Sequence, residues 1–221
     1  GGGKTEAYLG LAAYTMGLRR LQGEVAGRSG ECGVAVLMRY TLRLLTLQQF
    51  QRATALICAC ELIRREAEAA GKPVWGKEPF RIGLWVGSKS TPNWTEDAAE
   101  ALKQTKDVKA RQASNIGGKG SPVQLKSCPW CGSTIEPGRH VRVDPFASGS
   151  GRTLTYCGDR HGGCPFTERQ SKDEGLPVIV VDEEIYRRLP TLLIATVDKF
   201  AQMPWNGAVQ MLFGHVEQRC E

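Results

Sequence analysis

Gly1-Gly2-Gly3-Lys4-Thr5 is the stretch on which the fold assignment depends. Directly after it, apolar residues recur at three- and four-residue steps and predict an amphipathic helix over residues 4–22: Ala7, Leu11, Tyr14, Leu18 and Leu21. A glycine run followed by lysine and threonine at a helix start is the end of a Walker A loop, whose backbone N–H groups, lysine and threonine bind phosphates and Mg²⁺. We therefore predict a nucleotide-binding and Mg²⁺ site here, with Lys4 and Thr5 as its catalytic residues. The full signature needs a further glycine upstream, so we expect a longer protein.

Beyond this helix, short apolar runs alternate with helical patterns. The sequence predicts strands over residues 34–38, 81–86, 178–181 and 191–196, and helices over 44–70, 95–113, 183–189 and from about 198. Strands that alternate with helices imply a parallel sheet covered on both faces. The predicted fold class is therefore α/β.

Four of the eight cysteines form a cluster with the spacing of metal ligands: Cys128, Cys131, Cys157 and Cys164. Glycines next to three of them permit tight turns, and four thiolates suit tetrahedral Zn²⁺ in a structural role. His140 or His161 could replace one cysteine, and a cluster of thiols without metal is the other alternative. The remaining cysteines are scattered, and two of them fall in an apolar helical pattern.

The chain has 29 basic and 23 acidic residues. The surplus is concentrated between residues 101 and 127, which contain six basic residues and one acidic residue. This glycine-containing stretch predicts either a solvated linker or an arm that touches phosphates. No apolar window is long enough for a membrane span, and the first twenty residues lack the basic-then-apolar pattern of a signal peptide. We expect a cytoplasmic protein.

Three segments resemble motifs of superfamily-2 helicases, in the order that those proteins have. Residues 1–8 resemble motif I, in which an acidic or small residue such as Glu6 follows the lysine and threonine. Residues 34–52 are similar to motif Ia, which tracks the nucleic-acid backbone, and residues 192–200 look like the strand and threonine turn that make the next backbone contact. The amino-acid sequences of residues 39–46 and 195–201 most closely resemble those of the large helicases of the DISARM anti-phage systems.

The resemblance implies a RecA-like P-loop sheet with an inserted zinc-ribbon-like module. Residues 1–116 and 171–221 would belong to the first motor lobe, and residues 117–170 to the end of the basic linker and the insertion. ATP and Mg²⁺ would be bound by Gly1, Gly2, Gly3, Lys4, Thr5 and Glu6. Nucleic acid, DNA rather than RNA, would be contacted by Arg39, Thr41, Arg43, Gln48, Thr196 and Lys199. Further partners would be a second RecA-like lobe outside the chain and other defence proteins.

The physical argument for the backbone contacts does not need the resemblance. A turn that leaves a parallel strand lies at the sheet edge where α/β proteins bind ligands, and there Arg39, Thr41 and Arg43 could donate to phosphates. The alternative is that the arginines pair with acids on a neighbouring helix.

Asp182 and Glu183 follow an apolar strand and resemble a Walker B pair. They precede Thr196, against the helicase order, so we predict that Asp182 caps the following helix and that the catalytic carboxylates lie beyond Glu221.

Two other functions are compatible with parts of the sequence. A P-loop kinase or other NTPase that does not act on nucleic acid would explain residues 1–5, and a zinc-ribbon binding module would explain the cysteines. The helicase interpretation accounts for both and for the two later motifs. We expect the 221 residues alone to be inactive.

Overall fold

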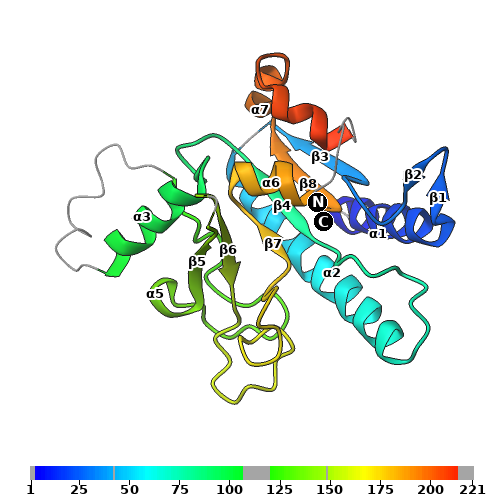
Figure 1. Cartoon of the computed structure of the whole chain (residues 1–221), viewed down its shortest axis with the longest axis horizontal. Coiled ribbons are helices and arrows are strands. Elements are labelled where there is room, and N and C mark those ends of the chain that lie inside the picture. The colour runs from blue at the N-terminus through cyan, green and yellow to red at the C-terminus, as the bar shows by residue number, and fades with distance from the viewer. Residues whose placement is uncertain (1–2, 42, 107–119, 148, 214–221) are drawn as a thin grey trace.

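The centre of the molecule is a four-stranded parallel sheet with the strand order β3-β8-β4-β7 (Figure 1). The computed structural model describes residues 3–41, 43–106, 120–147 and 149–213. The sheet strands are β3 Val36–Tyr40, β4 Ile82–Trp85, β7 Val178–Ile179 and β8 Leu192–Thr196. Helices flank this sheet, so the predicted α/β class is confirmed.

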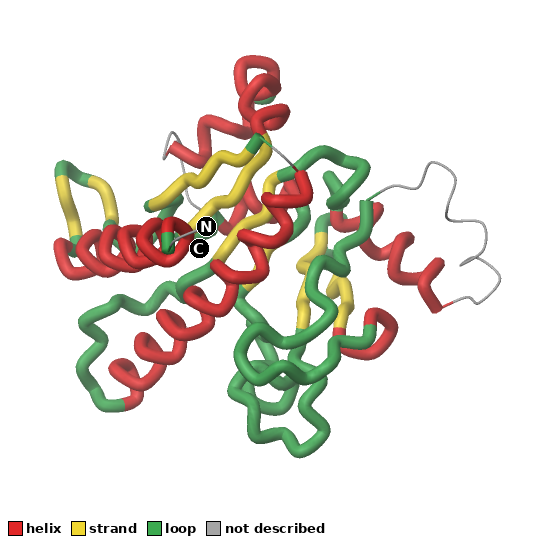
Figure 2. The backbone as a smooth tube through the Cα atoms, turned by 180° about the vertical axis from the view of Figure 1, so that it is seen from behind, coloured by secondary structure: helices red, strands yellow, loops and turns green. Residues whose placement is uncertain are grey.

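Helices cover both faces of the sheet (Figures 1 and 2). Two long helices, α1 Lys4–Gln22 and α2 Arg43–Ala69, lie on the face seen in Figure 2. The other face is covered by α6 Asp182–Arg188 and the 3-10 helix η2 Gly207–Phe213, with α7 Val197–Gln202 at its end. Within the described part of the chain, no helix is both long and apolar enough to cross a membrane.

Alternating side chains of β8 join two separate cores. Leu192 and Ile194 pack with Phe50 of α2, whereas Leu193 and Ala195 pack with residues of α6 and η2. All five residues of β8 are buried. This two-sided burial explains why the strand is a continuous apolar run instead of an alternating pattern.

Most predicted elements are observed with boundaries shifted by a few residues. The first helix matches its prediction, the strand predicted at residues 34–38 is found at 36–40, and the helix predicted over 95–113 is described as α3 Thr95–Lys106. Residues 107–119, which carry part of the basic stretch, lie outside the described residues. The elements that were not predicted are small: β1 Glu24–Val25, β2 Arg28–Ser29, α5 Pro137–His140, β5 Val141–Pro145, β6 Gly151–Thr155 and η1 Met203–Trp205.

The apolar stripe that identified α1 in the sequence is not the stripe that packs against the protein. The buried residues of α1 are Ala12, Met16 and Arg20. Arg20 is accommodated because its guanidinium donates to the carbonyl oxygens of Trp75 at 3.1 Å and Glu78 at 2.7 Å. The helix is confirmed, but its orientation differs from the one that the periodicity indicates.

Candidate functional site

The start of α1 lies beside the carboxyl end of the sheet. Strand pairing aligns Tyr40, the last residue of β3, with Thr196, the last residue of β8. Tyr8 of α1 and Tyr40 line one surface groove, so the first turns of α1 lie next to the end of β3. Lys4 is exposed and Thr5 is half-buried at this end. The predicted phosphate-binding residues therefore lie at the edge where parallel α/β sheets bind ligands.

Gly3 has the left-handed backbone that a phosphate loop uses. Its φ is 67°, and a Cβ atom there would meet nothing within 4 Å. The Gly3 carbonyl oxygen accepts a bond of 3.0 Å from the Ala7 N–H, which begins the helix. Gly1 and Gly2 lie outside the described residues. The carboxylate of Glu6 pairs with Arg52 of α2, so its predicted nucleotide contact stays a prediction.

Two of the predicted nucleic-acid contacts are exposed at the end of β3. Arg39 and Thr41 both face solvent, and the Arg39 guanidinium lies 5.9 Å from the centroid of the Phe200 ring. Gln48 is also exposed, early in α2. Arg43 is the first residue of α2, and its side chain is outside the described set.

Thr196 and Lys199 are buried at the same edge, with relative exposures of 5% and 6%. The Lys199 ammonium pairs with Asp182 and lies 6.0 Å from the centroid of the Trp85 ring. A contact between Lys199 and nucleic acid would require this ion pair to open. The roles predicted for Thr196 and Lys199 stay predictions.

Asp182 occupies the strand-to-helix junction that the sequence predicts, but it does not cap the helix. The N-cap position is Val181, no side-chain capping bond forms, and Asp182 is the first residue of α6. Burial raises the pKa of the Asp182 carboxyl group, and the adjacent Lys199 opposes this shift. The carboxylate thus joins α6 to α7.

The sequence analysis missed a loop at the end of β4. Because β4 pairs in parallel with β8, the loop that contains Gly87, Ser88 and Lys89 lies at the same sheet edge as Thr196. All three of these loop residues are exposed. The Ser88 carbonyl oxygen accepts a bond of 2.9 Å from the Gly120 N–H, so the chain returns to this edge after the basic stretch. A polar Gly-Ser-Lys-Ser after an apolar strand was the signal available in the sequence.

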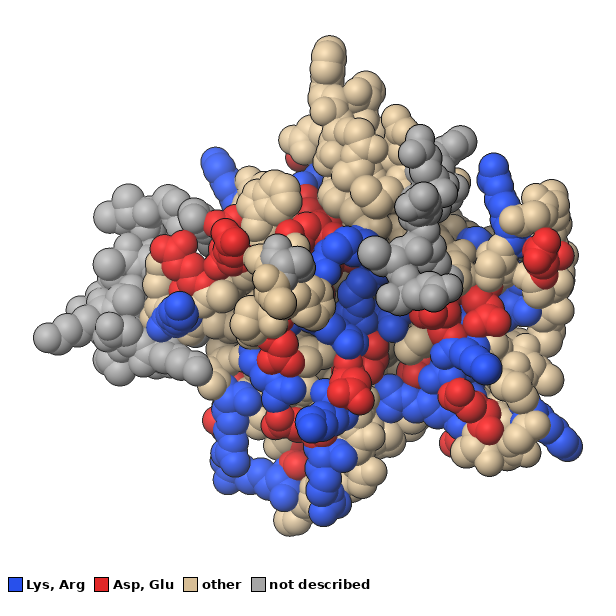
Figure 3. All heavy atoms as spheres, in the orientation of Figure 1, with Lys and Arg blue, Asp and Glu red and all other residues tan. Residues whose placement is uncertain are grey.

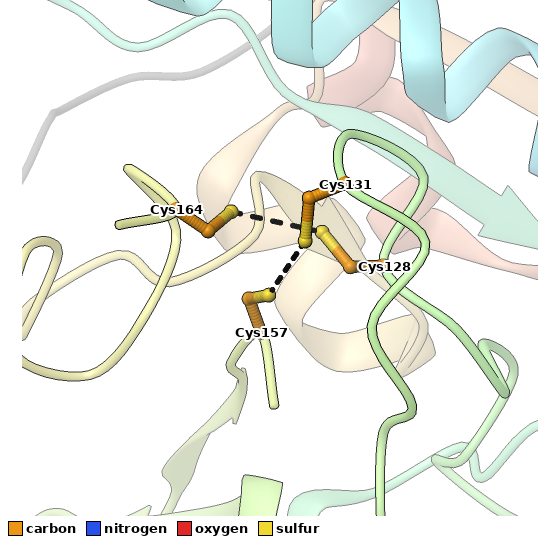
Figure 4. A group of neighbouring side chains, drawn as sticks. All are labelled: Cys128, Cys131, Cys157 and Cys164. Atoms are coloured by element: carbon orange, nitrogen blue, oxygen red, sulfur yellow. Dashed lines mark hydrogen bonds between the residues drawn. The ribbon is translucent and has the colours of Figure 1, made fainter. Parts of the chain in front are cut away.

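The four predicted cysteines converge on one point (Figure 4). Their sulfur atoms all lie within 4.8 Å of one another, and the Cys131 and Cys157 sulfurs are 3.3 Å apart. Three of the four are buried, and Cys131 is exposed. Among the described residues no histidine belongs to the group. His140 instead uses its Nδ1 atom to accept the Glu136 N–H at 2.9 Å. Four sulfurs at these distances could hold a structural metal such as zinc.

Two tight turns bring the cysteines together. In the first, the Gly132 N–H donates to the Cys128 carbonyl oxygen at 2.9 Å, and Gly132 adopts a φ of 79°. In the second, the carboxylate of Asp159 accepts the N–H groups of His161 at 3.0 Å and Cys164 at 2.8 Å. Both turns are fixed by local hydrogen bonds, so the sulfurs are preorganised.

Burial opposes the deprotonation of three of the four clustered thiols. Burial raises the pKa of the Cys157 thiol, and it raises that of Cys164 to about 12. Burial acts in the same direction on Cys131, but its hydrogen bonds with Ser133 and with the neighbouring thiols outweigh burial and lower its pKa to about 7. A divalent cation offsets the cost of burying thiolates, so metal binding would convert these thiols to thiolate ligands.

The cysteine region, which is the described part of the connection between α3 and β7 (residues 120–177), shares a core with the sheet. Three of its cysteines and Phe166 belong to the same buried cluster as Phe50 and Ile57 of α2. The Arg65 guanidinium of α2 lies 5.3 Å from the centroid of the Phe166 ring and donates to Ser171 Oγ at 3.2 Å. The region therefore packs against α2, and the domain limits proposed at residues 117 and 170 stay predictions.

A half-buried carboxylate, Glu174, connects the cysteine region to the sheet and to α6. It accepts bonds from Arg81 at 2.8 Å, Arg152 at 2.6 Å and Arg188 at 2.7 Å. These arginines precede β4, lie in β6 and end α6, respectively.

On the face shown in Figure 3, basic and acidic side chains are interspersed over the lower part of the molecule, so no single-sign patch covers the cysteine region there.

No protein-family model matches the chain. Over its whole length, the chain resembles DISARM protein DrmA. The DrmA protein of Bacillus paralicheniformis is 37% identical over 230 residues, which correspond to 100% of this chain and 18% of DrmA. This similarity supports the DISARM relationship that residues 39–46 and 195–201 suggest. The chain spans less than a fifth of the length of this relative.

Proposed function

We propose that these 221 residues form the first part of a RecA-like motor lobe in an ATP-dependent superfamily-2 helicase or translocase that acts in anti-phage defence. The observation that carries the proposal is that α1, which begins with Lys4 and Thr5, lines one groove with the end of β3, which carries Arg39. The similarity to DISARM protein DrmA supports the defence role.

At the nucleotide site, the N–H groups of the glycine run and of the first turn of α1 would surround the phosphates. The positive end of the helix dipole adds to this attraction. Lys4 would neutralise the outer phosphates, and Thr5 would bind Mg²⁺ through its hydroxyl group. The carboxylates that activate water would come from outside residues 1–221, because Asp182 is buried against Lys199.

At the nucleic-acid site, Arg39, Thr41, Arg43 and Gln48 would contact backbone phosphates, with DNA as the preferred substrate. Contacts to phosphate position the strand without reading its sequence, as a translocating motor requires. Lys199 would assist by holding α7 against Asp182, so that the turn at Thr196 keeps its place at the end of β8.

At the metal site, the four cysteines would hold one Zn²⁺ with closed tetrahedral coordination. No position would remain open for a catalytic water, so the metal would be structural. Its effect would be to keep Phe166 against α2 and to maintain the path of the chain between β4 and β7.

The test is ATP hydrolysis by the full-length protein, measured with and without DNA and RNA. Lys4→Ala should abolish hydrolysis under all conditions. Arg39→Ala should lower the stimulation by polynucleotide and leave the basal rate unchanged. Lys72→Ala is the matched control, because Lys72 is exposed just beyond the C-terminal end of α2 and should be neutral.

The outcomes separate the alternatives. Hydrolysis that depends on Lys4 but is indifferent to polynucleotide would indicate a P-loop enzyme of another class. A protein that binds no ATP, with or without Lys4, would indicate a zinc-dependent binding module. Stronger stimulation by RNA than by DNA would reverse the substrate preference.

A further inference from the structure

One of the four clustered cysteines is open to solvent, and the other three are not. Cys131 is exposed, whereas Cys128, Cys157 and Cys164 are 2%, 4% and 4% exposed. Gly132, which follows Cys131, is also exposed and carries no side chain. The reactivity of a thiol towards an oxidant follows its access and its thiolate character. A small oxidant dissolved in water therefore reaches the Cys131 sulfur before the other three.

The exposed sulfur also lies close to a second thiol. The Cys131 and Cys157 sulfurs are 3.3 Å apart, whereas those of Cys128 and Cys164 are 3.9 Å apart (Figure 4). A disulfide bond is about 2.0 Å long, so the first pair needs the smaller movement to form one. The two residues are 26 positions apart in the sequence, whereas Cys128 belongs to the same short turn as Cys131. The distance therefore points to a cross-link between the two turns.

We propose that Cys131 and Cys157 form a site of reversible oxidation by a peroxide, and that their cross-link prevents the cluster from holding a metal. This inference goes beyond the motor activity. It rests on the arrangement of the four cysteines and on neither ATP nor nucleic-acid binding.

The chemistry has two steps. Hydrogen peroxide oxidises the Cys131 sulfur to a sulfenic acid and releases one water. The Cys157 sulfur then attacks the Cys131 sulfur, and the hydroxyl group leaves with the thiol proton of Cys157 as a second water. The two electrons that reduce the peroxide come from the two sulfurs. A dithiol reductant reverses the reaction by thiol–disulfide exchange. Because thiolates are the metal ligands, the cross-link removes two of the four.

The cross-link acts on the part of the sheet with the shortest strand pairing. β7 pairs with β4 at two positions, whereas β8 pairs with β4 at four and with β3 at five. Trp130, beside Cys131, lies edge-on to Phe166 with ring centroids 6.4 Å apart, and Phe166 belongs to the core beneath α2. Oxidation therefore loosens the cysteine region and β7 and leaves the other three strands paired.

Peptide mapping of the full-length protein tests the pairing. The protein is treated with one equivalent of hydrogen peroxide, alkylated and digested with trypsin, which yields peptides 127–139, 153–160 and 161–169. Cys128 and Cys131 share the first peptide, and Cys157 and Cys164 lie in the second and third. We expect the first and second peptides to be linked through Cys131. About one zinc should be released per cross-link, and a dithiol should reverse both changes.

Serine variants separate the two steps. Cys157→Ser should retain a sulfenic acid on Cys131, which a 1,3-diketone probe traps. Cys131→Ser should form no link between peptides 127–139 and 153–160. Cys60→Ser is the matched control, because Cys60 is half-buried in α2 and lies outside the cluster, and it should behave as the natural chain does.

Two readouts on the natural protein do not depend on any variant. Cys131 should be oxidised at least about tenfold faster than Cys128 or Cys164, in keeping with its exposure. The amides of residues 178–179 should exchange faster after oxidation, and those of residues 192–196 should keep their protection.

Three results would overturn the proposal: a disulfide between Cys128 and Cys131 within the first peptide, equal oxidation of all four cysteines, or no cross-link with peroxide. Failure of the proposed metal site is recognised separately, because zinc is measured before peroxide is added. A protein without zinc that still links Cys131 to Cys157 would refute the metal site and uphold the oxidation site.

Discussion

Replacing Glu174 by glutamine would remove a negative charge with which Arg81, Arg152 and Arg188 all pair. Burial alone would raise the pKa of this carboxyl group, but Arg188 and Arg81 outweigh burial and lower it from 4.5 to about 2. A shift of this size corresponds to about 3 kcal/mol of interaction, and breaking a buried ion pair costs a similar amount. Burial lowers the pKa of Arg188 to about 10, so Arg188 stays charged at neutral pH and would be repelled by the neighbouring guanidinium groups in the variant.

The contribution of Glu174 to the free energy of unfolding depends on pH in a defined direction. Because the folded pKa of Glu174 lies below its unfolded value, its contribution is complete above about pH 4.5 and is lost as the pH falls towards 2. The difference in stability between the natural chain and Glu174→Gln should therefore be constant between pH 7 and pH 5.5.

Urea unfolding of the zinc-loaded chain would measure this difference. Glu168→Gln is the matched control, because Glu168 is 56% exposed and pairs with Arg142 at the surface. The control should cost less than about 1 kcal/mol, since exposed ion pairs contribute little. If both substitutions had equal effects, Glu174 would not join the cysteine region to the sheet.

Three further predictions concern the cysteine region and α7. Metal analysis should find one zinc per chain, and Cys128→Ser should remove it and lower the unfolding midpoint, because metal binding supplies folding free energy. Gly158→Ala should destabilise the chain by a few kcal/mol, since a Cβ atom there would lie 1.9 Å from a backbone carbonyl oxygen, whereas Gly163→Ala should be tolerated with its nearest atom at 3.7 Å. Asp182→Asn should cost about 3–5 kcal/mol in thermal or urea unfolding because it leaves a buried ammonium group unpaired.

The sequence predicted the elements with long or continuous patterns. The 27-residue α2 was found because its apolar residues recur over many turns and Gly71 ends it. The β5–β6 hairpin was missed because its strands are only five residues long and include Pro145 and Gly151, residue types that are uncommon within strands. Its position depends on contacts with α3 and β7, which are distant in sequence.

The candidate sites also differ in how far the sequence alone could predict them. The cysteine cluster could be predicted because metal geometry restricts ligand spacing within each short turn. The partner of Lys199 could not, because the contact joins the first residue of α6 to α7 across the core, 17 residues apart. Glu174 carried no local signal, since its three arginines lie before β4, in β6 and at the end of α6.

The long connection between β4 and β7 explains why this fold would need both a metal and the half-buried ion cluster around Glu174. These strands are neighbours in the sheet, yet they pair at only two positions, Ile82 with Val178 and Gly83 with Ile179. The intervening chain includes α3 and all four clustered cysteines, and ordering so long a connection costs conformational entropy. The cysteine cluster fixes this connection against α2, and Glu174 fixes it against Arg81 at the start of β4. Short strand pairing can therefore persist at this edge of the sheet because the connection itself is anchored on both sides of it.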